Sequence, residues 1–418
     1  MIRKLKGIGI LDVISSEVFS ILQICATTEP LFPNIKTLDL WPTGQSIPFI
    51  PLFLSPRTTA ISIGFSSPSF SKAMVALMIT TFPKLCPDLR YINLHTLPEH
   101  PMIVTAVSAM LLTSNRDALR RFRVCSPLTE EAREVAYTLP NLRGLWAVIR
   151  GDTPLPPVVL PNLTHLTITY DYDGNWLRLF RGATLGPLEA VTFHPESEQI
   201  GDFLEAFERV ALATSIQNTL SSFRLYALCS WNPNYPSLHR FTQMTDLFIR
   251  FVCNDGCSST VDDDVVAGLA RAMPKLENLE LGGEPCCEIP TGVTAKGLVA
   301  LADHCPDLSF LRIHFQVASL TAPPTVSRMA SNAVSAVPRG GCALRDLEVG
   351  EIPVPEESVL MVALTLAHIF PHIVYIDGVD ENWFKVAGAI RRSKEIIDCS
   401  SKCNSPPLHP EVILVTLP

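Results

Sequence analysis

Charged residues are scarce in this chain of 418 residues. Asp, Glu, Lys and Arg make up 18% of it, and 33 basic against 41 acidic residues give a net charge of −8. The longest basic run is the short stretch at 120–123. Because nucleic-acid binding needs concentrated positive charge, this composition argues against nucleic acid as a partner. With 47% hydrophobic residues, the chain can form a large core, which excludes disorder of the whole chain.

The sequence also lacks the features of a secreted or membrane-inserted chain. Its 12 cysteines are spread out and mostly lie in apolar stretches, which is typical of free thiols rather than of a disulfide framework. The N-terminus begins like a signal peptide, but Asp12 and Glu17 interrupt its apolar run. Residues 358–376 carry no Asp, Glu, Lys or Arg, yet Pro371 would end a helix there. A buried helix followed by a buried strand fits this segment better than a membrane span. We therefore expect a cytoplasmic or nuclear protein that does not contact a membrane.

Catalytic and metal-binding motifs are missing as well. Gly7-Ile8-Gly9 begins like a dinucleotide-binding loop, but Asp12 occupies the place of the third glycine. Neither a P-loop lysine nor a G-x-S-x-G motif occurs. The cysteine pairs at 253/257, 286/287 and 399/403 are poorly spaced for a tetrahedral zinc site, and Asp262–Asp264 suits a helix N-terminus better than a calcium loop. We expect a protein that is not an enzyme and needs no cofactor or metal.

Prolines, by contrast, are abundant, at 35 against 21 glycines. Many of them stand just before an L-x-x-L-x-L pattern. The clearest copies are PNIKTLDL (33–40), PDLRYINL (87–94), PNLTHLTI (161–168), PKLENLEL (274–281) and PDLSFLRI (306–313). With looser copies included, the first apolar positions fall at 35, 58, 89, 119, 142, 163, 188, 220, 244, 276, 308, 344 and 373. Their mean spacing of about 28 residues lies within the range of leucine-rich repeats.

The intervals between these patterns predict a unit of one strand followed by one helix. Helical apolar periodicity occurs at 200–210, 265–273, 298–302 and 359–369, whereas the short intervals within 142–188 leave room only for a turn or a 3₁₀ segment. Stacked units predict an α/β fold, a leucine-rich-repeat solenoid (horseshoe) with a parallel concave sheet and outer helices. We expect an N-terminal helical cap at 1–30, a degenerate solenoid at 31–398 and a poorly ordered tail at 399–418.

Several of these segments resemble the leucine-rich-repeat proteins of the F-box type that form large fungal families. The resemblance rests on PLFPNIKTLDLW (30–41), LFLSPRTTAISI (52–63) and the CPDL joints at 86–89 and 305–308, and it covers about residues 11–395. It implies that the repeats select a substrate for a cullin ubiquitin ligase, and that an F-box binds the Skp adaptor. However, ISSEVFSIL (14–22) lacks the proline of the F-box opening L-P-x-E. We therefore expect the F-box to be missing, so that Skp and cullin are partners only if an F-box exists.

Strand alternation predicts which side chains a partner would meet. The leucines of L-x-x-L-x-L face the core, so positions 3, 5 and 7 project from the concave face. The candidate protein-binding residues are Arg121, Arg123, Trp146, His165, Arg224, Tyr226, Phe248, Arg250, Phe310, Arg312 and His314. Towards the C-terminus the same positions turn acidic, with Asp246, Glu280, Asp346, Glu348 and Asp377.

Arginine and aromatic residues are typical of binding hot spots, and arginine suits carboxylates and phosphates. The pattern therefore predicts a groove for an acidic or phosphorylated protein segment. The alternative is that these side chains are only the solvated faces of strands, because every repeat must expose something there. The function that we expect is a noncatalytic protein-interaction module, which the resemblance makes the substrate-recognition region of a ligase receptor. The alternatives are a repeat scaffold with no role in ubiquitin transfer and a membrane-anchored repeat protein.

Overall fold

The computed structural model describes most of the chain. The described residues are 3–8, 17–18, 21, 30–42, 46–65, 70–149, 155–170, 176–195, 203–228, 235–252, 261–283, 292–321 and 342–402. The chain forms two compact units, residues 1–225 and 226–418. In the described part of the chain, no helix is long and apolar enough to cross a membrane.

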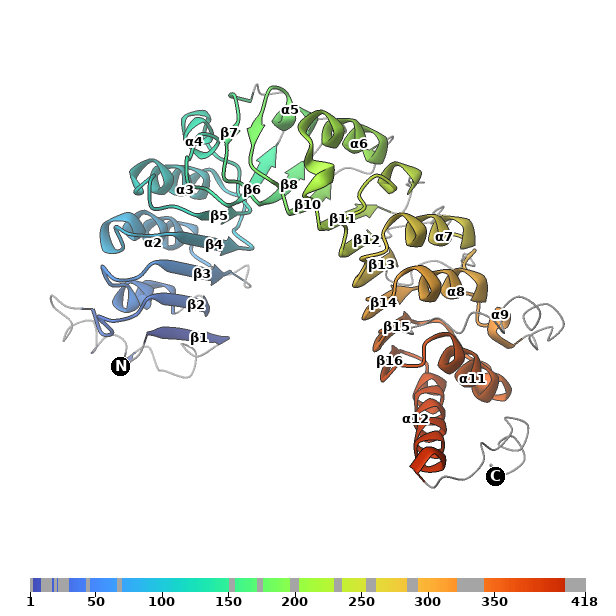
Figure 1. Ribbon diagram of the computed structural model, residues 1–418. Coiled ribbons are helices and arrows are strands. Elements are labelled where there is room, and N and C mark those ends of the chain that lie inside the picture. The colour runs from blue at the N-terminus through green and yellow to red at the C-terminus, as the bar shows by residue number, and fades with distance from the viewer. Residues whose placement is uncertain are drawn as a thin grey trace. The chain divides into compact units, whose positions relative to one another are not determined.

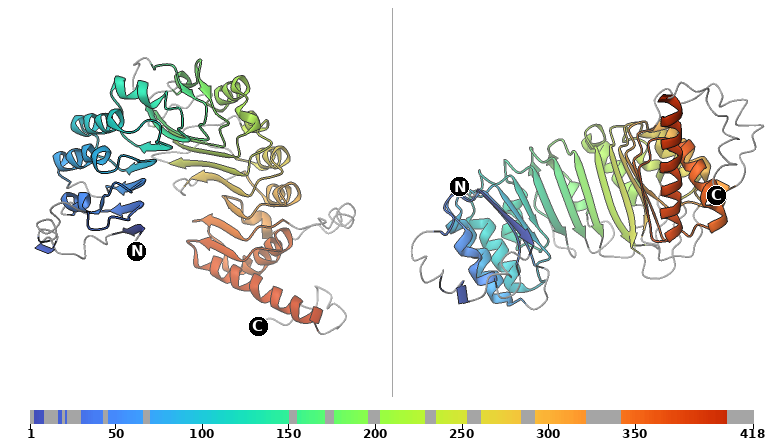
Figure 2. Two further views of the ribbon diagram at one scale, coloured as in Figure 1. Left: turned by 60° about the vertical axis from the view of Figure 1, so that its left-hand side comes forward. Right: turned by 90° about the horizontal axis from the view of Figure 1, so that it is seen from below.

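The first unit is a parallel sheet with helices on one of its faces (Figures 1 and 2). The strands follow one another in sequence order, and each pairs in parallel with the next. They are β1 (Lys4–Ile8), β2 (Thr37–Trp41), β3 (Ala60–Gly64), β4 (Tyr91–His95), β5 (Arg121–Val124), β6 (Gly144–Ile149), β8 (His165–Tyr170), β10 (Ala190–Pro195) and β11 (Ser222–Leu228). The connecting helices are η2 (Ile47–Phe53), α2 (Lys72–Leu85), α3 (Pro101–Thr113), α4 (Glu130–Ala136), α5 (Leu177–Phe180), α6 (Phe203–Thr214) and η3 (Ile216–Asn218).

The second unit repeats this plan. Its parallel strands are β12 (Asp246–Val252), β13 (Asn278–Gly283), β14 (Phe310–Ile313), β15 (Asp346–Gly350) and β16 (Tyr375–Gly378). Its helices are η4 (Tyr235–Leu238), α7 (Asp263–Ala272), α8 (Ala295–His304), α9 (Ala318–Thr321), η5 (Glu356–Ser358), α11 (Val359–Ile369) and α12 (Glu381–Lys402). Helices of successive repeats pack side by side, as α7 does on α8 and α11 on α12. The predicted α/β fold class, a repeat of strands in a parallel sheet with helices outside it, is confirmed.

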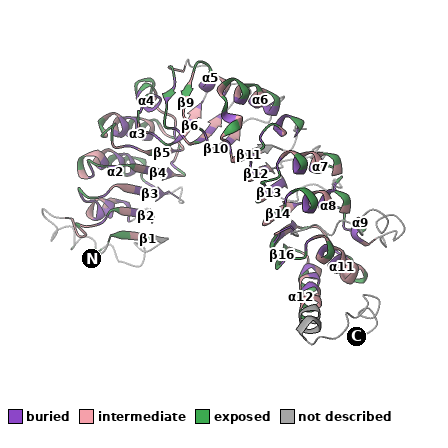
Figure 3. Ribbon diagram, in the orientation of Figure 1, coloured by how far each residue is buried: buried purple, intermediate pink, exposed green. Residues whose placement is uncertain are grey.

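The sequence pattern sets the register of every repeat. Each of the thirteen predicted units contains a strand that begins two residues after its first apolar position, from Thr37 after Ile35 to Tyr375 after Ile373. The apolar positions are buried, and most residues between them are half-buried or exposed (Figure 3). The helices predicted at 200–210, 265–273, 298–302 and 359–369 correspond to α6, α7, α8 and α11.

Backbone hydrogen bonds join each repeat to the one before it in a constant way. The amides of Arg120 and Arg121 both donate to the carbonyl oxygen of Arg90, and those of Ser309 and Phe310 donate to that of Glu277. In each case the two donors lie one and two residues after the first apolar position of their own repeat. The acceptor lies one residue after the first apolar position of the preceding repeat. This shared carbonyl fixes neighbouring strands at the same level.

The two ends of the chain differ from the prediction. Residues 4–8 form β1, parallel to β2, where we expected a helical cap. The alternation of Lys4, Leu5 and Lys6 has the period of a strand, so the error lay in the choice of period. At the other end, α12 runs from 381 to 402, so the predicted boundary at 398/399 falls inside a helix. Residues 403–418 lie outside the described residues, and the predicted tail is therefore not tested.

The middle of the first unit also contains more than the predicted turns. Between β6 and β10, the strands β7 (Val159–Leu160) and β9 (Thr184–Leu185) pair in a small second sheet, and α5 follows Trp176. The buried ring of Trp176 meets those of Phe193 and Phe203, with centroids 5.3 and 4.7 Å apart. Phe207 and Phe223 complete this aromatic cluster around Phe193. The cluster therefore joins the short repeat that contains Trp176 to the longer repeat that contains α6.

The aspartates at 262–264 begin α7, as predicted. Asp262 caps the helix by accepting a hydrogen bond from the amide of Val265 at 2.9 Å. Asp263 joins two repeats, because its carboxylate accepts bonds from the Thr294 amide and hydroxyl, at 2.7 and 2.6 Å, and from the Gly297 amide at 2.9 Å. These carboxylates therefore serve the two helix N-termini of α7 and α8.

Replacing Phe193 by Ala should lower the free energy of unfolding by about 3–5 kcal/mol, because it removes the ring at the centre of the aromatic cluster. The matched control is Leu212→Ala on α6, where the side chain is 43% exposed and little burial is lost. Chemical denaturation of both variants measures the difference. A Phe193→Ala variant as stable as the Leu212→Ala variant would contradict the central place of this cluster.

Candidate functional site

The candidate site is the sheet face that carries no helices, here called the helix-free face of each unit (Figure 1). All eleven predicted binding residues lie on it, and each is half-buried or exposed. The first unit carries Arg121, Arg123, Trp146, His165 and Arg224, and the second carries Tyr226, Phe248, Arg250, Phe310, Arg312 and His314. The predicted register of the strands is therefore right at every one of these positions, whereas their role in binding stays a prediction.

Arg123 belongs to a stack that crosses the helix-free face of the first unit. Its guanidinium carbon lies 5.6 Å from the centre of the Trp146 ring, a distance suited to a cation–π interaction. On β10, the His194 ring stacks on Trp146 with centroids 5.6 Å apart and planes 15° apart. Trp146 is held further by its Nε1, which donates to Thr169 Oγ1 at 2.9 Å. The arginine is thus placed beside an aromatic pair whose orientation is fixed before any partner binds.

A second aromatic pair lies on β2 and β4 of the same unit. The rings of Trp41 and His95 stack with centroids 5.7 Å apart and planes 12° apart. Trp41 lies over Gly64, where any Cβ would overlap the indole, so only glycine fits at that position on β3. The buried Asn93 approaches His95 Nε2 with its amide nitrogen at 2.5 Å. If that amide donates, the imidazole is neutral and carries its proton on Nδ1.

Sequence reasoning did not single out Trp41, Asn93, His95 or His194. Trp41, His95 and His194 stand six residues after a first apolar position, which is the last outward-facing place of a strand. The alternation rule could have found them, because it also predicts that position to be outward. Their stacking partners could not be predicted, because stacking depends on rotamers and on the glycine beneath Trp41.

The three histidines of this face are uncharged near neutral pH. Burial, followed by the charge of Arg123, lowers the pKa of His95 and lowers that of His194 to about 4. Burial and the charge of Arg121 lower the pKa of His165. Near these histidines, positive charge is carried by Arg121, which is exposed, and Arg123, which is half-buried. Across the described ranges of the chain, neither arginine forms an ion pair.

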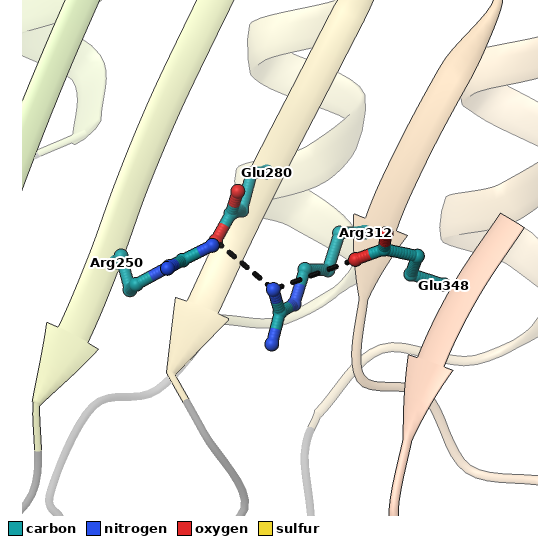
Figure 4. Close-up of polar contacts among 4 residues, drawn as sticks. All are labelled: Arg250, Glu280, Arg312 and Glu348. Atoms are coloured by element: carbon teal, nitrogen blue, oxygen red, sulfur yellow. Dashed lines mark hydrogen bonds and ion pairs between the residues drawn. The ribbon is translucent and has the colours of Figure 1, made fainter. Parts of the chain in front are cut away.

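On the helix-free face of the second unit, Arg250 and Arg312 are paired with carboxylates of the same face. Arg250 Nε donates to Glu280 Oε1 at 2.6 Å, and Arg312 Nη1 lies 3.8 Å from the same oxygen and 3.4 Å from Glu348 Oε2 (Figure 4). Glu280 is only 4% exposed, so the prediction that it presents a negative charge to a partner is wrong. Its burial follows from the two arginines that flank it. Asp246 likewise accepts a hydrogen bond from Asn278 at 2.7 Å.

Metal and thiol chemistry find no site in the described part of the chain. There, no group of three or more His, Cys, Asp or Glu side chains could hold a metal ion. Burial raises the pKa of Cys86 to about 11 and that of Cys305 to about 12, so these thiols stay protonated and are poor nucleophiles. The cysteine pairs at 253/257, 286/287 and 399/403 cannot be compared, because their side chains lie outside the described residues.

Replacing Glu280 by Ala should lower the free energy of unfolding by about 1–3 kcal/mol, because it leaves Arg250 and Arg312 without their shared carboxylate in a half-buried place. The control is Glu356→Ala, which removes the exposed pair with Lys385 and should cause no measurable change. Denaturant midpoints of the two variants make the comparison. Equal stability of both variants would show that the Glu280 network contributes nothing to folding.

The lowered pKa of His194 predicts a pH dependence of stability. Between its ordinary pKa of 6.5 and about 4, the unfolded chain binds a proton that the folded chain does not. Stability from this group is therefore complete above pH 6.5 and is lost as the pH falls towards 4. Between pH 7 and 4.5, the His194→Gln variant should lose about 1–2 kcal/mol less of its unfolding free energy than the wild type loses. The control is His372→Gln, at an exposed position, which should lose as much as the wild type. Parallel urea titrations at both pH values decide this, and identical losses in all three proteins would refute it.

Comparison with known proteins identifies no family for this chain. No protein-family model matches the sequence, and no curated protein matches it. Among solved structures, the chain is similar to the crystal structure of a protein from Bacteroides fragilis, with 12% identity and a TM-score of 0.35. The similarity covers 61% of this chain and 66% of that one, so this chain spans just under two thirds of that protein's length. A likeness of this size carries no argument about function.

Proposed function

We propose that this protein is a noncatalytic protein-interaction module whose first unit binds an acidic or phosphorylated protein segment. The observation that carries the proposal is the pair Arg121 and Arg123, on a helix-free face and without a carboxylate partner among the described residues. Guanidinium groups bind carboxylates and phosphates through paired hydrogen bonds. An anionic segment would supply the partner that the fold does not.

The placing of the two arginines suits an extended segment. They stand two residues apart on β5, so they point to the same side and their Cα atoms lie roughly 6.5–7 Å apart. Acidic side chains at alternate positions of an extended partner repeat at the same distance. We therefore expect acidic or phosphorylated residues at alternate positions of the bound segment.

Neighbouring residues hold the side chains of Arg121 and Arg123 in place, and this favours binding. Arg123 is held over Trp146, and the aliphatic stem of Arg121 lies close above Gly144. Side chains that are already ordered lose less conformational entropy when a partner binds. Trp146 adds an aromatic surface of the kind that is enriched in binding hot spots.

The second unit is a weaker candidate for an anionic partner. Arg250 and Arg312 are occupied by Glu280 and Glu348, so an acidic segment would have to displace carboxylates that already lie in place. The half-buried Phe248 and Phe310 offer apolar contacts instead. We assign the anionic contact to the first unit for this reason.

The role of a substrate receptor for a cullin ubiquitin ligase is part of the proposal only through the resemblance to F-box-type repeat proteins. A repeat scaffold with no ubiquitin role would use the same surface. The two differ in their partners, since a receptor requires the Skp adaptor and a scaffold does not. Capture of the tagged full-length chain from its own cells, followed by mass spectrometry, separates them: Skp and cullin subunits are recovered with a receptor and are absent with a scaffold.

The binding surface is tested with Arg121→Ala combined with Arg123→Ala. In the same capture experiment, this variant should recover its main partners at least about tenfold less well than the wild type, because two charge-assisted contacts are lost. The control, Arg116→Ala combined with Arg271→Ala, makes the same change in net charge at exposed places away from the helix-free faces and should recover them normally. Equal recovery by both double variants would exclude this face as the binding surface.

A further inference from the structure

An arginine and a histidine flank a glycine on the helix-free face of the first unit. Gly144 on β6 pairs with Arg121 on β5 on one side and with His165 on β8 on the other. Because Gly144 has no side chain, the stem of Arg121 leans towards it, and Cγ of Arg121 would lie 3.2 Å from a Cβ at this position. Arg121 is thereby directed towards β8, and no side chain of β6 stands between it and His165 in this row. The charges of Arg121 and Arg123 both act on the His165 ring.

A pair of hydrogen bonds decides which nitrogen of the neutral His165 ring carries the proton. The Thr164 hydroxyl oxygen lies 2.8 Å from Nδ1 of His165 and 3.1 Å from the carbonyl oxygen of Arg143. A hydroxyl group has one proton and a carbonyl oxygen can only accept, so that proton goes to Arg143. Nδ1 is therefore the donor of the other bond, and Nε2 carries no proton. Among the described residues, no hydrogen bond engages Nε2 of this exposed side chain.

The charged and titratable groups around His165 come from three neighbouring strands. The strands beside β8 are β6 and β10, with Arg143 just before β6, Glu189 just before β10 and the uncharged His194 on β10. Partial burial lowers the pKa of His165, as do the charges of Arg121 and Arg123 on β5, while Glu189 raises it. In the free protein, His165 is thus a neutral ring beside positive charge, with an unprotonated nitrogen to offer.

A phosphate monoester suits this arrangement better than a carboxylate does. One guanidinium satisfies both oxygens of a carboxylate, whereas a phosphate brings three acceptor oxygens and up to two negative charges. A second donor beside Arg121 is therefore of use only to the phosphate. A nearby anion favours the charged form of an imidazole, and a dianion does so more strongly than a monoanion. A phosphate at Arg121 would thus offset the effect of the two arginines on the His165 ring.

We propose that this site selects a phosphorylated segment over one that carries only carboxylates, because His165 takes up a proton at Nε2 and joins Arg121 in binding the phosphate. The proton comes from solvent. The phosphate lies between Arg121 and His165 above Gly144, and the next acidic or phosphorylated side chain of the segment lies at Arg123. This selection rests on the proposed function, since it uses the same two arginines.

Binding is measured by calorimetry with a short acetylated peptide that carries phosphoserine at alternate positions, and with a counterpart that carries glutamate there. At pH 6.5 the wild type should bind the phosphorylated peptide at least about tenfold more tightly than the glutamate peptide. His165→Asn, which keeps a polar group near Thr164 but has nothing at Nε2, should bind the phosphorylated peptide about fivefold less tightly than the wild type at pH 6.5. At pH 8.5 the two should bind it equally, because the histidine is neutral there. The control, His372→Asn at an exposed position, should match the wild type at both pH values.

The state of the ring provides a second readout that is independent of affinity. In the NMR spectrum of protein labelled in its histidines, the signal that is lost in His165→Asn belongs to His165. At pH 6.5 this signal should be that of a neutral ring protonated on Nδ1 in the free protein. On saturation with the phosphorylated peptide, it should move to the position of a charged ring, and the glutamate peptide should move it less.

The outcomes separate this selection from the proposed function. If the phosphorylated peptide binds the wild type but not Arg121→Ala combined with Arg123→Ala, while His165 stays neutral in the complex, the role of His165 is wrong and the proposed function stands. Equal affinity of the wild type for the two peptides would overturn the preference for phosphate and also leave the proposed function standing. If neither peptide binds the wild type, both proposals fail.

Discussion

The structure depends on one repeated contact, the parallel pairing of each strand with the next at the same level. Within each unit, two amides share one carbonyl at the joints between repeats, and this shared acceptor sets the register from repeat to repeat. Because side chains alternate along each strand, a constant register places equivalent positions in rows across the sheet. The apolar rows form the core beneath the helices. The outward rows form the helix-free faces, so the surface of this protein is as regular as its core.

Rows of equivalent positions create a constraint on charge. Where successive repeats carry charged residues in one row, like charges would lie about 5 Å apart, and unlike charges neutralise one another. The second unit alternates Glu280, Arg312 and Glu348 in one row, and the ion pairs follow. In the first unit, Arg123 has Asn93 opposite it on β4 and Trp146 within cation–π distance. The same architecture therefore yields one face whose Arg250 and Arg312 are paired with carboxylates and one whose Arg121 and Arg123 have no carboxylate partner among the described residues.

The sequence predicted the repeats because their cause is local. The burial of three apolar side chains per strand recurs at a fixed spacing, and every predicted strand begins two residues after its first apolar position. Where the pattern was short or mixed, it was misjudged. Lys4, Leu5 and Lys6 were taken for part of a helix, and the strands β7 and β9, two residues each, are too short for any period to be visible.

The positions of the candidate residues could be predicted from the sequence, but the contacts that their side chains make could not. Alternation alone puts Arg123, Arg250 and Arg312 outward, and the structure has them there. Whether an arginine already has a partner within the fold depends on side chains of the adjoining strands, which belong to other repeats and are distant in sequence. Arg250 meets Glu280 on the next strand, whereas Arg123 meets the face of Trp146.

The difference between these arginines has a consequence for recognition. A guanidinium already paired with a buried carboxylate gives up one strong contact to make another, so exchange brings little net free energy. A guanidinium held over an indole keeps its hydrogen-bond donors at the edge of its plane and can use them while the stack persists. The two arginines thus make different contacts, Arg123 with an indole ring and Arg250 with a carboxylate, and in each case a side chain of the adjoining strand decides which contact forms.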